Sequence, residues 1–200
     1  MNWIKSIEEL ERLYDAAVPT SLEKVAAQLT PLYRRWIEVS RFVVVSTVGP
    51  EGTDASPRGD IEPVVHIADA KTIWLPDWRG NNRIDTLRNI VRDGRISLMF
   101  MVPGCNNVVR INGRALLTAD AETLAHFERK GKQPKTVTVI SIDEIYFQCA
   151  KALMRSTLWS SDDESALVPS AGDFIKEFKA GFDGTAYDAD YPESSKARMW

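Results

Sequence analysis

The chain has 200 residues, of which 44% are hydrophobic and 26% charged, and its formal net charge is -3 at pH 7. This length and composition are typical of a soluble globular chain that buries a sizeable core in one domain with appendages. The slightly acidic charge argues against broad electrostatic binding to nucleic acid, although a basic pocket can exist within an acidic surface.

We expect a reduced cytoplasmic protein that binds no metal, nucleic acid or membrane. The first residues lack the apolar core of a signal peptide, and no run approaches the roughly 18 apolar residues that a membrane span needs. Cys105 and Cys149 form no C-x-x-C pair, and the sequence has no H-E-x-x-H motif, G-x-S-x-G motif or P-loop. No catalytic acid, base or nucleophile can be assigned.

Residues 1–40 are predicted to form an N-terminal helical extension. Ser6 is expected to cap a first helix, Thr20 to begin a second, and Pro31 to open a third. Three residues of the third helix are expected to face the core: Leu32, Trp36 and Ile37.

From Arg41 the sequence takes on the pattern of β-strands. Six strands are predicted, at 42–48, 64–68, 72–75, 96–102, 108–117 and 136–147. Two helices are expected between them, at about 82–93 and 121–130. Hairpin connections with only two helical excursions favour a mainly β fold with flanking helices (α+β), a six-stranded antiparallel closed barrel within residues 41–159.

Residues 160–200 are predicted to be a C-terminal extension. The segment begins with a polar, acidic stretch at 160–165, and 189–200 mixes proline, serine and charge, so part of it is expected to be loop. A helix at about 171–180, with Phe174 and Phe178 on one face, is expected to dock on the barrel or on a partner subunit.

Two segments carry arginine and small polar residues directly after apolar runs, at 55–60 and 75–83. Asn81 or Asn82 is a favoured N-cap for the helix that follows, and backbone N–H groups at a helix start bind anions. Arg58 and Arg83 can add charge-assisted bonds to phosphate oxygens. This pattern predicts a phosphate site, whereas a capped helix with solvated arginines explains the second segment alone.

In order along the chain, these segments resemble the FMN-binding split-barrel proteins related to pyridoxamine 5'-phosphate oxidase. The shared landmarks are a Ser-Pro-Arg-Gly-Asp segment, a Pro-Asp-x-Arg-Gly-Asn-x-Arg turn, a Leu-Arg-Asn-Ile helix and three shorter motifs. They lie at 56–60, 76–83, 87–90, 102–104, 110–115 and 149–152. Several ordered motifs are far more specific than one. The resemblance covers residues 42–159 and implies an antiparallel split barrel that binds FMN.

The resemblance implies which residues bind the cofactor. The flavin phosphate would be held by Arg58, Asn81, Asn82 and Arg83. The oxidase itself carries serine, arginine and lysine at the turn, so this chain has one cationic charge fewer there. The isoalloxazine ring would lie between two groups of residues: Leu75, Pro76 and Asp77 on one side, and Ser56 and Pro57 on the other, for which strand-end geometry is the structural alternative.

The resemblance also implies a homodimer with the flavin at the subunit interface. Lys151 and Arg155 are four residues apart, so both can project from one helical face toward the ligand of the partner subunit. A solvated basic face is the alternative. Trp159 is followed by an acidic stretch that suits a phosphorylated substrate poorly, which argues against vitamin B6 oxidation and leaves the small-molecule substrate unidentified.

Three functional hypotheses remain. The first is an FMN-dependent oxidoreductase of unknown substrate. The second is a non-catalytic flavin-binding or redox-sensing protein. The third keeps the barrel but replaces FMN with a deazaflavin or haem. A haem would need an axial ligand, for which His66 and His126 are the only histidines, and both are interpreted as structural residues.

Overall fold

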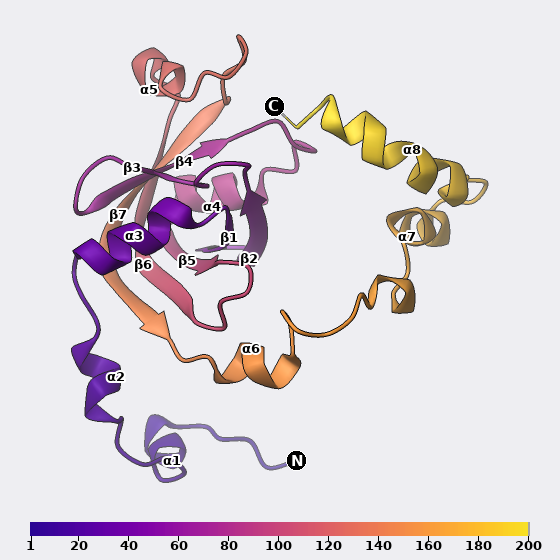
Figure 1. Cartoon of the computed structure of the whole chain (residues 1–200). Coiled ribbons are helices and arrows are strands. Elements are labelled where there is room, and N and C mark those ends of the chain that lie inside the picture. The colour runs from indigo at the N-terminus through magenta and orange to yellow at the C-terminus, as the bar shows by residue number, and fades with distance from the viewer. Residues whose placement is uncertain (200) are drawn as a thin grey trace.

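The computed structural model describes residues 1–199 and is built around one seven-stranded antiparallel sheet (Figure 1). The strands are β1 (Phe42–Gly49), β2 (Gly52–Gly59), β3 (His66–Ile67), β4 (Thr72–Asp77), β5 (Arg95–Met101), β6 (Val108–Thr118) and β7 (Thr136–Gln148). Their order across the sheet is β2-β1-β5-β6-β7-β4-β3. The mainly β fold with flanking helices is therefore confirmed.

The sheet differs from the predicted closed, six-stranded barrel in strand number and in closure. The additional strand is β2, which pairs with β1 from Phe42 opposite Gly59 to Gly49 opposite Gly52. None of the residues of β2 is fully buried, and its sequence has no apolar run that would predict a strand. Pro57 is tolerated because β2 is an edge strand. Because β2 and β3 are the edges of the hydrogen-bonded ladder, the barrel is not closed, which confirms the split barrel that the family resemblance implies.

The core is formed by apolar residues that alternate along the central strands. In β1, Val43 and Val45 are buried while their neighbours are more exposed, as expected for a strand with one face on the core. Helix α3 (Pro31–Val39) covers this core with Ile37, and Trp36 packs against it from a half-buried position. Leu32, predicted to face the core, is 79% exposed because it lies on the opposite side of α3.

Helix α4 (Asp85–Arg92) packs against β1, β2 and β6, and begins three residues later than the predicted start at Asn82. Its N-cap is Ile84, whose side chain makes no capping bond, so neither asparagine caps the helix. Asn82 and Ile84 both have positive φ, at 60° and 53°, which prevents the helix from extending backwards. The Asn81 side chain instead accepts a 3.0 Å bond from the Arg83 N–H.

Helix α5 (Ala121–Ala125) is shorter than the predicted 121–130. Its C-cap is His126, and the chain that follows forms a tight turn with positive φ at Lys130 and Gly131 instead of further helical turns. At the N-terminus, Ser6 caps α1 (Ile7–Glu11) as predicted, and α2 (Pro19–Glu23) begins one residue before the expected position. Neither of these two N-terminal helices contains a buried residue.

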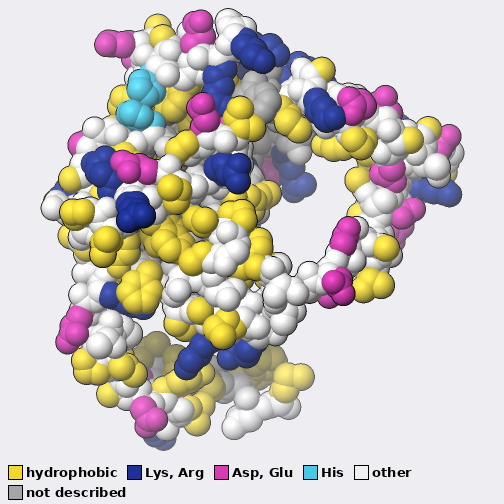
Figure 2. All heavy atoms as spheres, in the orientation of Figure 1, with side chains coloured by type: hydrophobic (Ala, Val, Ile, Leu, Met, Phe, Trp, Pro, Cys, Tyr) yellow, Lys and Arg dark blue, Asp and Glu magenta, His cyan; other side chains and the backbone are white. Residues whose placement is uncertain are grey.

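The C-terminal segment forms an arm that stands away from the sheet (Figures 1 and 2). Its elements are α6 (Lys151–Ser156), the 3-10 helix η1 (Ser165–Leu167), α7 (Ala171–Phe178) and α8 (Gly184–Lys196). Helices α7 and α8 pack closely at Gly172 and Gly184, where an added Cβ on Gly172 would lie 2.2 Å from the Gly184 carbonyl oxygen.

The C-terminal extension was predicted to be partly loop, and 189–200 was one of the stretches on which this rested. Most of that stretch is helical, because α8 continues through Pro192 to Lys196. Trp200 lies outside the described residues. Within residues 1–199, no helix is both long and apolar enough to cross a membrane.

Candidate functional site

A cavity of about 980 Å³ lies between the ends of β2 and β4 and the start of α4. Its walls are formed by residues 56–61 and 75–87, together with Asp54, Val64, Lys135, Thr136 and Met199. The predicted site residues on this lining are Ser56, Pro57, Arg58, Leu75, Pro76, Asp77, Asn81, Asn82 and Arg83. The fold thus gathers two sequence segments that were linked only by their resemblance to a family.

Lys151 and Arg155 do not line this cavity in their own chain. Both lie on the short helix α6, one helical turn apart, and both are exposed. Trp159, which follows the helix, donates a 2.9 Å hydrogen bond from Nε1 to the carbonyl oxygen of Cys105. This bond ties the start of the C-terminal arm to the loop that follows β5.

Arg58 presents a guanidinium group at the cavity wall. Its Nη1 donates hydrogen bonds to Ser56 Oγ and, at 3.0 Å, to the Pro57 carbonyl oxygen. Its Nη2 lies 4.0 Å from Asp77 Oδ1, so this ion pair spans from β2 to β4. The Arg58 side chain is only 26% exposed, which reduces the screening of its charge by solvent.

Asp77 is a half-buried carboxyl group at the end of β4. Burial raises the pKa of Asp77 above its ordinary value, and the nearby charges of Arg58 and Lys135 oppose this change. Asp77 therefore takes up a proton more readily than an exposed aspartate. It can offer a ligand either an acceptor when ionised or a donor when protonated.

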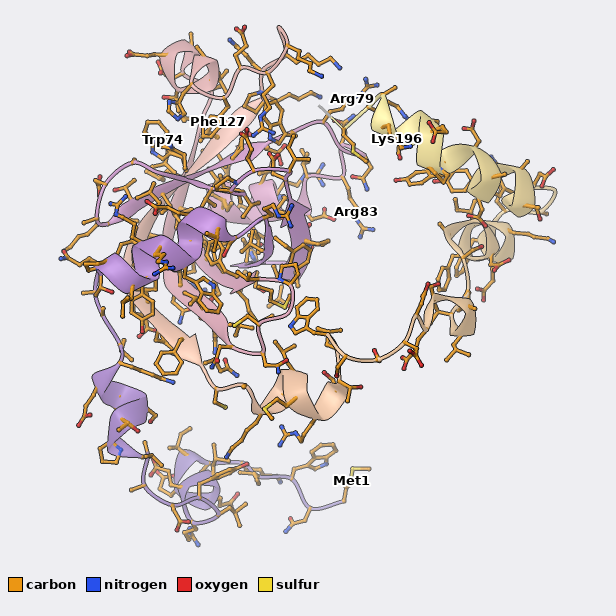
Figure 3. All side chains as sticks on the ribbon, viewed as in Figure 1. Met1, Trp74, Arg79, Arg83, Phe127 and Lys196 are labelled. Carbon is orange, nitrogen blue, oxygen red and sulfur yellow. The ribbon has the colours of Figure 1, made fainter. Side chains whose placement is uncertain are left out.

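The turn after β4 brings two cations and two amides to the mouth of the cavity. Arg79 and Arg83 are both exposed and extend from this turn on the side that faces the C-terminal helix (Figure 3). Arg83 Nε lies 2.6 Å from Asp85 Oδ2, so its guanidinium group is already paired. Binding of an anion by Arg83 would compete with this exposed, weakly stabilising ion pair.

Sequence reasoning missed Lys135, which lines the cavity immediately before β7. Its Nζ donates a 3.1 Å hydrogen bond to Asn82 Oδ1 on the opposite turn. The turn at 81–83 has one cationic charge fewer than the corresponding turn of the oxidase, and Lys135 supplies a cation beside it. It lies 53 residues from Asn82 in sequence and belongs to no motif, so only the pairing of β4 with β7 reveals its position.

Two buried polar atoms beside the cavity have no hydrogen-bond partner among the described residues. They are Trp78 Nε1 and Thr136 Oγ1, and both residues contribute to the lining. A buried donor without a partner costs about 1–3 kcal/mol, so such atoms are normally satisfied by some group. Together with the cationic side chains, they form a set of donors that fits a ligand rich in oxygen and nitrogen acceptors.

The two histidines lie together outside the cavity lining: His66 is the first residue of β3, and His126 directly follows α5. The ring centroids of His66 and His126 are 4.1 Å apart, and Trp74 and Phe127 complete the cluster (Figures 2 and 3). Burial, together with the neighbouring His126, lowers the pKa of His66. Within residues 1–199, no three His, Cys, Asp or Glu side chains are grouped as a metal site.

The comparison with protein families identifies the chain's relatives. Residues 29–149 match the sequence model of the family described as pyridoxamine 5'-phosphate oxidase. No match was found among curated proteins.

Several solved structures have a similar fold. A putative pyridoxamine 5'-phosphate oxidase from Lactobacillus delbrueckii is 18% identical with a TM-score of 0.49, covering 60% of this chain and 95% of its own. HupZ from Group A Streptococcus is 21% identical with a TM-score of 0.47, covering 58% and 91%. The general stress protein 26 from Bacillus anthracis is 13% identical with a TM-score of 0.45, covering 57% and 88%. Because the family match spans more than half of the sequence, this chain belongs to the pyridoxamine 5'-phosphate oxidase family.

Proposed function

We propose that this protein binds FMN in the cavity between β2 and β4 and acts as an oxidoreductase on a small molecule. The observation that carries the proposal is the convergence of Arg58, Lys135 and the 78–83 turn on one cavity whose lining follows the family's motifs. FMN would supply hydride and electron transfer, while the protein would bind and orient the reactants.

The phosphate would be held by the cationic part of the lining. Arg58 would contribute a planar fork of donors and Lys135 a compact charge, with amide groups of Asn81 and Asn82 beside them. Lys135 donates a 3.1 Å hydrogen bond to Asn82, so these two groups already lie side by side. The family's basic turn is therefore replaced by residues from two different elements.

The ring would lie against the apolar end of β4. Leu75 and Pro76 are buried residues at the cavity wall and offer an apolar surface, while Ser56 and Pro57 line the opposite strand. Asp77 lies at the end of β4, 4.0 Å from Arg58 on the opposite wall. Its carboxyl group would accept a hydrogen bond from a ring N–H when ionised, and would tune the electronic properties of the ring through its charge.

The cavity is large enough for more than the cofactor. At about 980 Å³ it lies at the upper end of the roughly 300–1,000 Å³ range typical of small-molecule sites. The remaining space would admit a small substrate next to the ring. The substrate itself remains unidentified, and no residue is assigned as a catalytic acid or base.

A second subunit would complete the site. Lys151 and Arg155 are exposed on one turn of α6 and line no cavity in their own chain, which suits a role at a homodimer interface. In this proposal, residues 41–159 form the cofactor-binding domain and residues 1–40 a helical extension. Residues 160–200 form a C-terminal extension that packs on the barrel or on the partner subunit. A cytoplasmic location remains a prediction.

Haem is disfavoured as an alternative cofactor. The chain has two histidines, and both lie in the cluster with Trp74 and Phe127 rather than on the cavity lining. A haem in this cavity would therefore lack a histidine axial ligand from its own chain. A deazaflavin carries a phosphate and would suit the same cations, so it remains the chemical alternative to FMN.

The test is an absorbance spectrum of the purified protein after incubation with FMN and removal of free ligand, with mass analysis of the released chromophore. Flavin bands with the mass of FMN support the proposal. Turnover of NAD(P)H or reaction with dioxygen would then distinguish an enzyme from a flavin-binding or redox-sensing protein. A deazaflavin or haem mass, or no chromophore at all, would contradict FMN binding.

A further inference from the structure

Arg129 connects the two strand ends that form the walls of the cavity, although it does not itself line the cavity. These walls are the ends of β2 and β4, which are not neighbours in the sheet. No backbone ladder therefore sets the distance between them. Side-chain contacts across the split have to do so, and the 4.0 Å Arg58–Asp77 pair is one such contact.

The guanidinium group of Arg129 contacts both sides of this split. On the β2 side, Nη1 lies 2.5 Å from Asp60 Oδ1 and Nη2 lies 2.8 Å from Glu62 Oε2. On the β4 side, Cζ lies 5.5 Å from the centroid of the Trp78 ring, within the range of a cation–π interaction. Trp78 directly follows Asp77 in the sequence, and Asp60 lies two residues after Arg58.

The Asp60 carboxylate makes this contact energetically important. Its side chain is only 3% exposed, and Arg129 provides its one ion pair among the described residues. A buried carboxylate is tolerated only when it is paired and hydrogen-bonded, and here the second bond comes from the Ile61 N–H at 2.6 Å. The loop that follows Arg58 is therefore fixed to Arg129.

Arg129 is itself held by a tight turn. Its backbone N–H and carbonyl group exchange two 2.9 Å hydrogen bonds with Lys132. The two residues between them, Lys130 and Gly131, have φ of 52° and 74°, as in a two-residue hairpin with positive φ at both central positions. This turn presents the guanidinium group in a fixed position instead of on a flexible loop.

We propose that Arg129 is the positioning residue that sets the separation of the two cavity walls. The proposal rests on the proposed function in one respect, namely that the ligand held between these walls is FMN. Through Asp60 and Trp78, Arg129 holds Arg58 and Asp77 at the spacing that the ligand requires. Its contribution to affinity is indirect, because Arg129 touches neither the cavity nor the ligand.

The test compares three variants with the wild-type chain. Arg129→Gln removes the charge and the fork of donors. Arg129→Gln combined with Asp60→Asn removes both charges, so that no unpaired buried carboxylate is left to unfold the protein. Lys130→Gln removes a cation from the same turn, and within residues 1–199 the Lys130 side chain makes no ion pair, so this variant is the matched control.

Two quantities are measured on each variant. The first is backbone hydrogen exchange of the ligand-free protein, which reports the mobility of the two walls without any cofactor. The second is the dissociation constant for FMN. We expect faster exchange at 59–64 and 76–82, unchanged exchange in β5 and β6, and at least tenfold weaker FMN binding in both Arg129 variants. The control should match wild type.

Each outcome decides one of the two proposals. If the double variant shows the same hydrogen-exchange rates and the same FMN dissociation constant as the wild-type protein, the positioning role is overturned. If exchange rises across the entire sheet to the same extent, Arg129 acts on global stability and the positioning role is also overturned. If wild-type protein binds no FMN, the proposed function fails, and the hydrogen-exchange comparison alone supports or overturns the connection between the walls.

Discussion

Replacing Arg58 with alanine is expected to raise the dissociation constant for FMN about a hundredfold. A hydrogen bond to a charged group contributes about 1.5–3 kcal/mol, which corresponds to roughly a 10- to 150-fold change in affinity. The upper part of this range applies because the Arg58 side chain is only 26% exposed, so water screens its charge weakly. Its loss also removes the cation that lies 4.0 Å from the half-buried Asp77 carboxyl group.

The assay is a flavin fluorescence titration of Arg58→Ala, Arg58→Lys and a control variant. The control is Arg34→Ala, which removes an arginine of similar charge from α3, where it lies 3.7 Å from Glu38 in a largely exposed ion pair. Arg58→Lys should keep part of the affinity, because it retains the charge but loses the planar fork. An unchanged dissociation constant in a folded Arg58→Ala variant would refute the assignment of the phosphate to this residue.

Three further predictions concern stability and pH. Asp77→Asn should stabilise the protein at neutral pH. Burying the ionised Asp77 carboxylate costs folding free energy; this cost is absent below the ordinary pKa of 3.8 and fully present only above the raised pKa. A loss of stability in urea denaturation would contradict this. The pKa of His66 is lowered in the folded protein, so the unfolded chain binds a proton first and stability should fall as the pH drops below 6.5. His66→Gln should weaken this dependence of stability on pH between pH 7.5 and 5.5. The same dependence in His66→Gln and wild type would exclude His66 as its source. Gly113→Ala should destabilise by about 2–3 kcal/mol, because the added Cβ would lie 2.0 Å from the Ser141 carbonyl oxygen in the paired strand, and an unchanged midpoint of thermal unfolding would show that the backbone moves freely there.

The sequence predicted the family and the fold class because both depend on local patterns. Short runs rich in apolar residues at 42–48 and 96–102 identified strands that the structure contains as β1 and β5. The ordered Ser-Pro-Arg-Gly-Asp and Pro-Asp-x-Arg-Gly-Asn segments identified the family, which the match over 29–149 confirms. Patterns of this kind can be read from the sequence without any knowledge of tertiary contacts.

The errors occurred where tertiary structure overrides local propensity. Asn82 is a favoured N-cap in isolation, but its positive φ makes it part of the turn, and α4 starts at Asp85 without a side-chain cap. Pro192 favoured a loop, yet α8 continues through it while packing against α7. Strand β2 was not among the six predicted strands because its pairing with β1, and not its composition, makes it a strand.

The parts of the site that no motif could reveal come from distant segments. Lys135 reaches Asn82, and Arg129 reaches Asp60 across 69 positions of sequence, through the connection between α5 and β7. Neither residue lies in a segment with a recognisable spacing. Charge balance offered one clue, since the turn that carries Asn81 and Asn82 had one cation fewer than the family's, but it could not indicate which lysine supplies the charge.

The most direct test of the central claim is a crystal structure of the protein grown with FMN. We predict FMN in the cavity between β2 and β4, with its phosphate within hydrogen-bond distance of Arg58 and Lys135 and its ring against Leu75 and Pro76. A cavity that stays without FMN at saturating concentration, or FMN bound with its phosphate away from Arg58, would contradict FMN binding at this site.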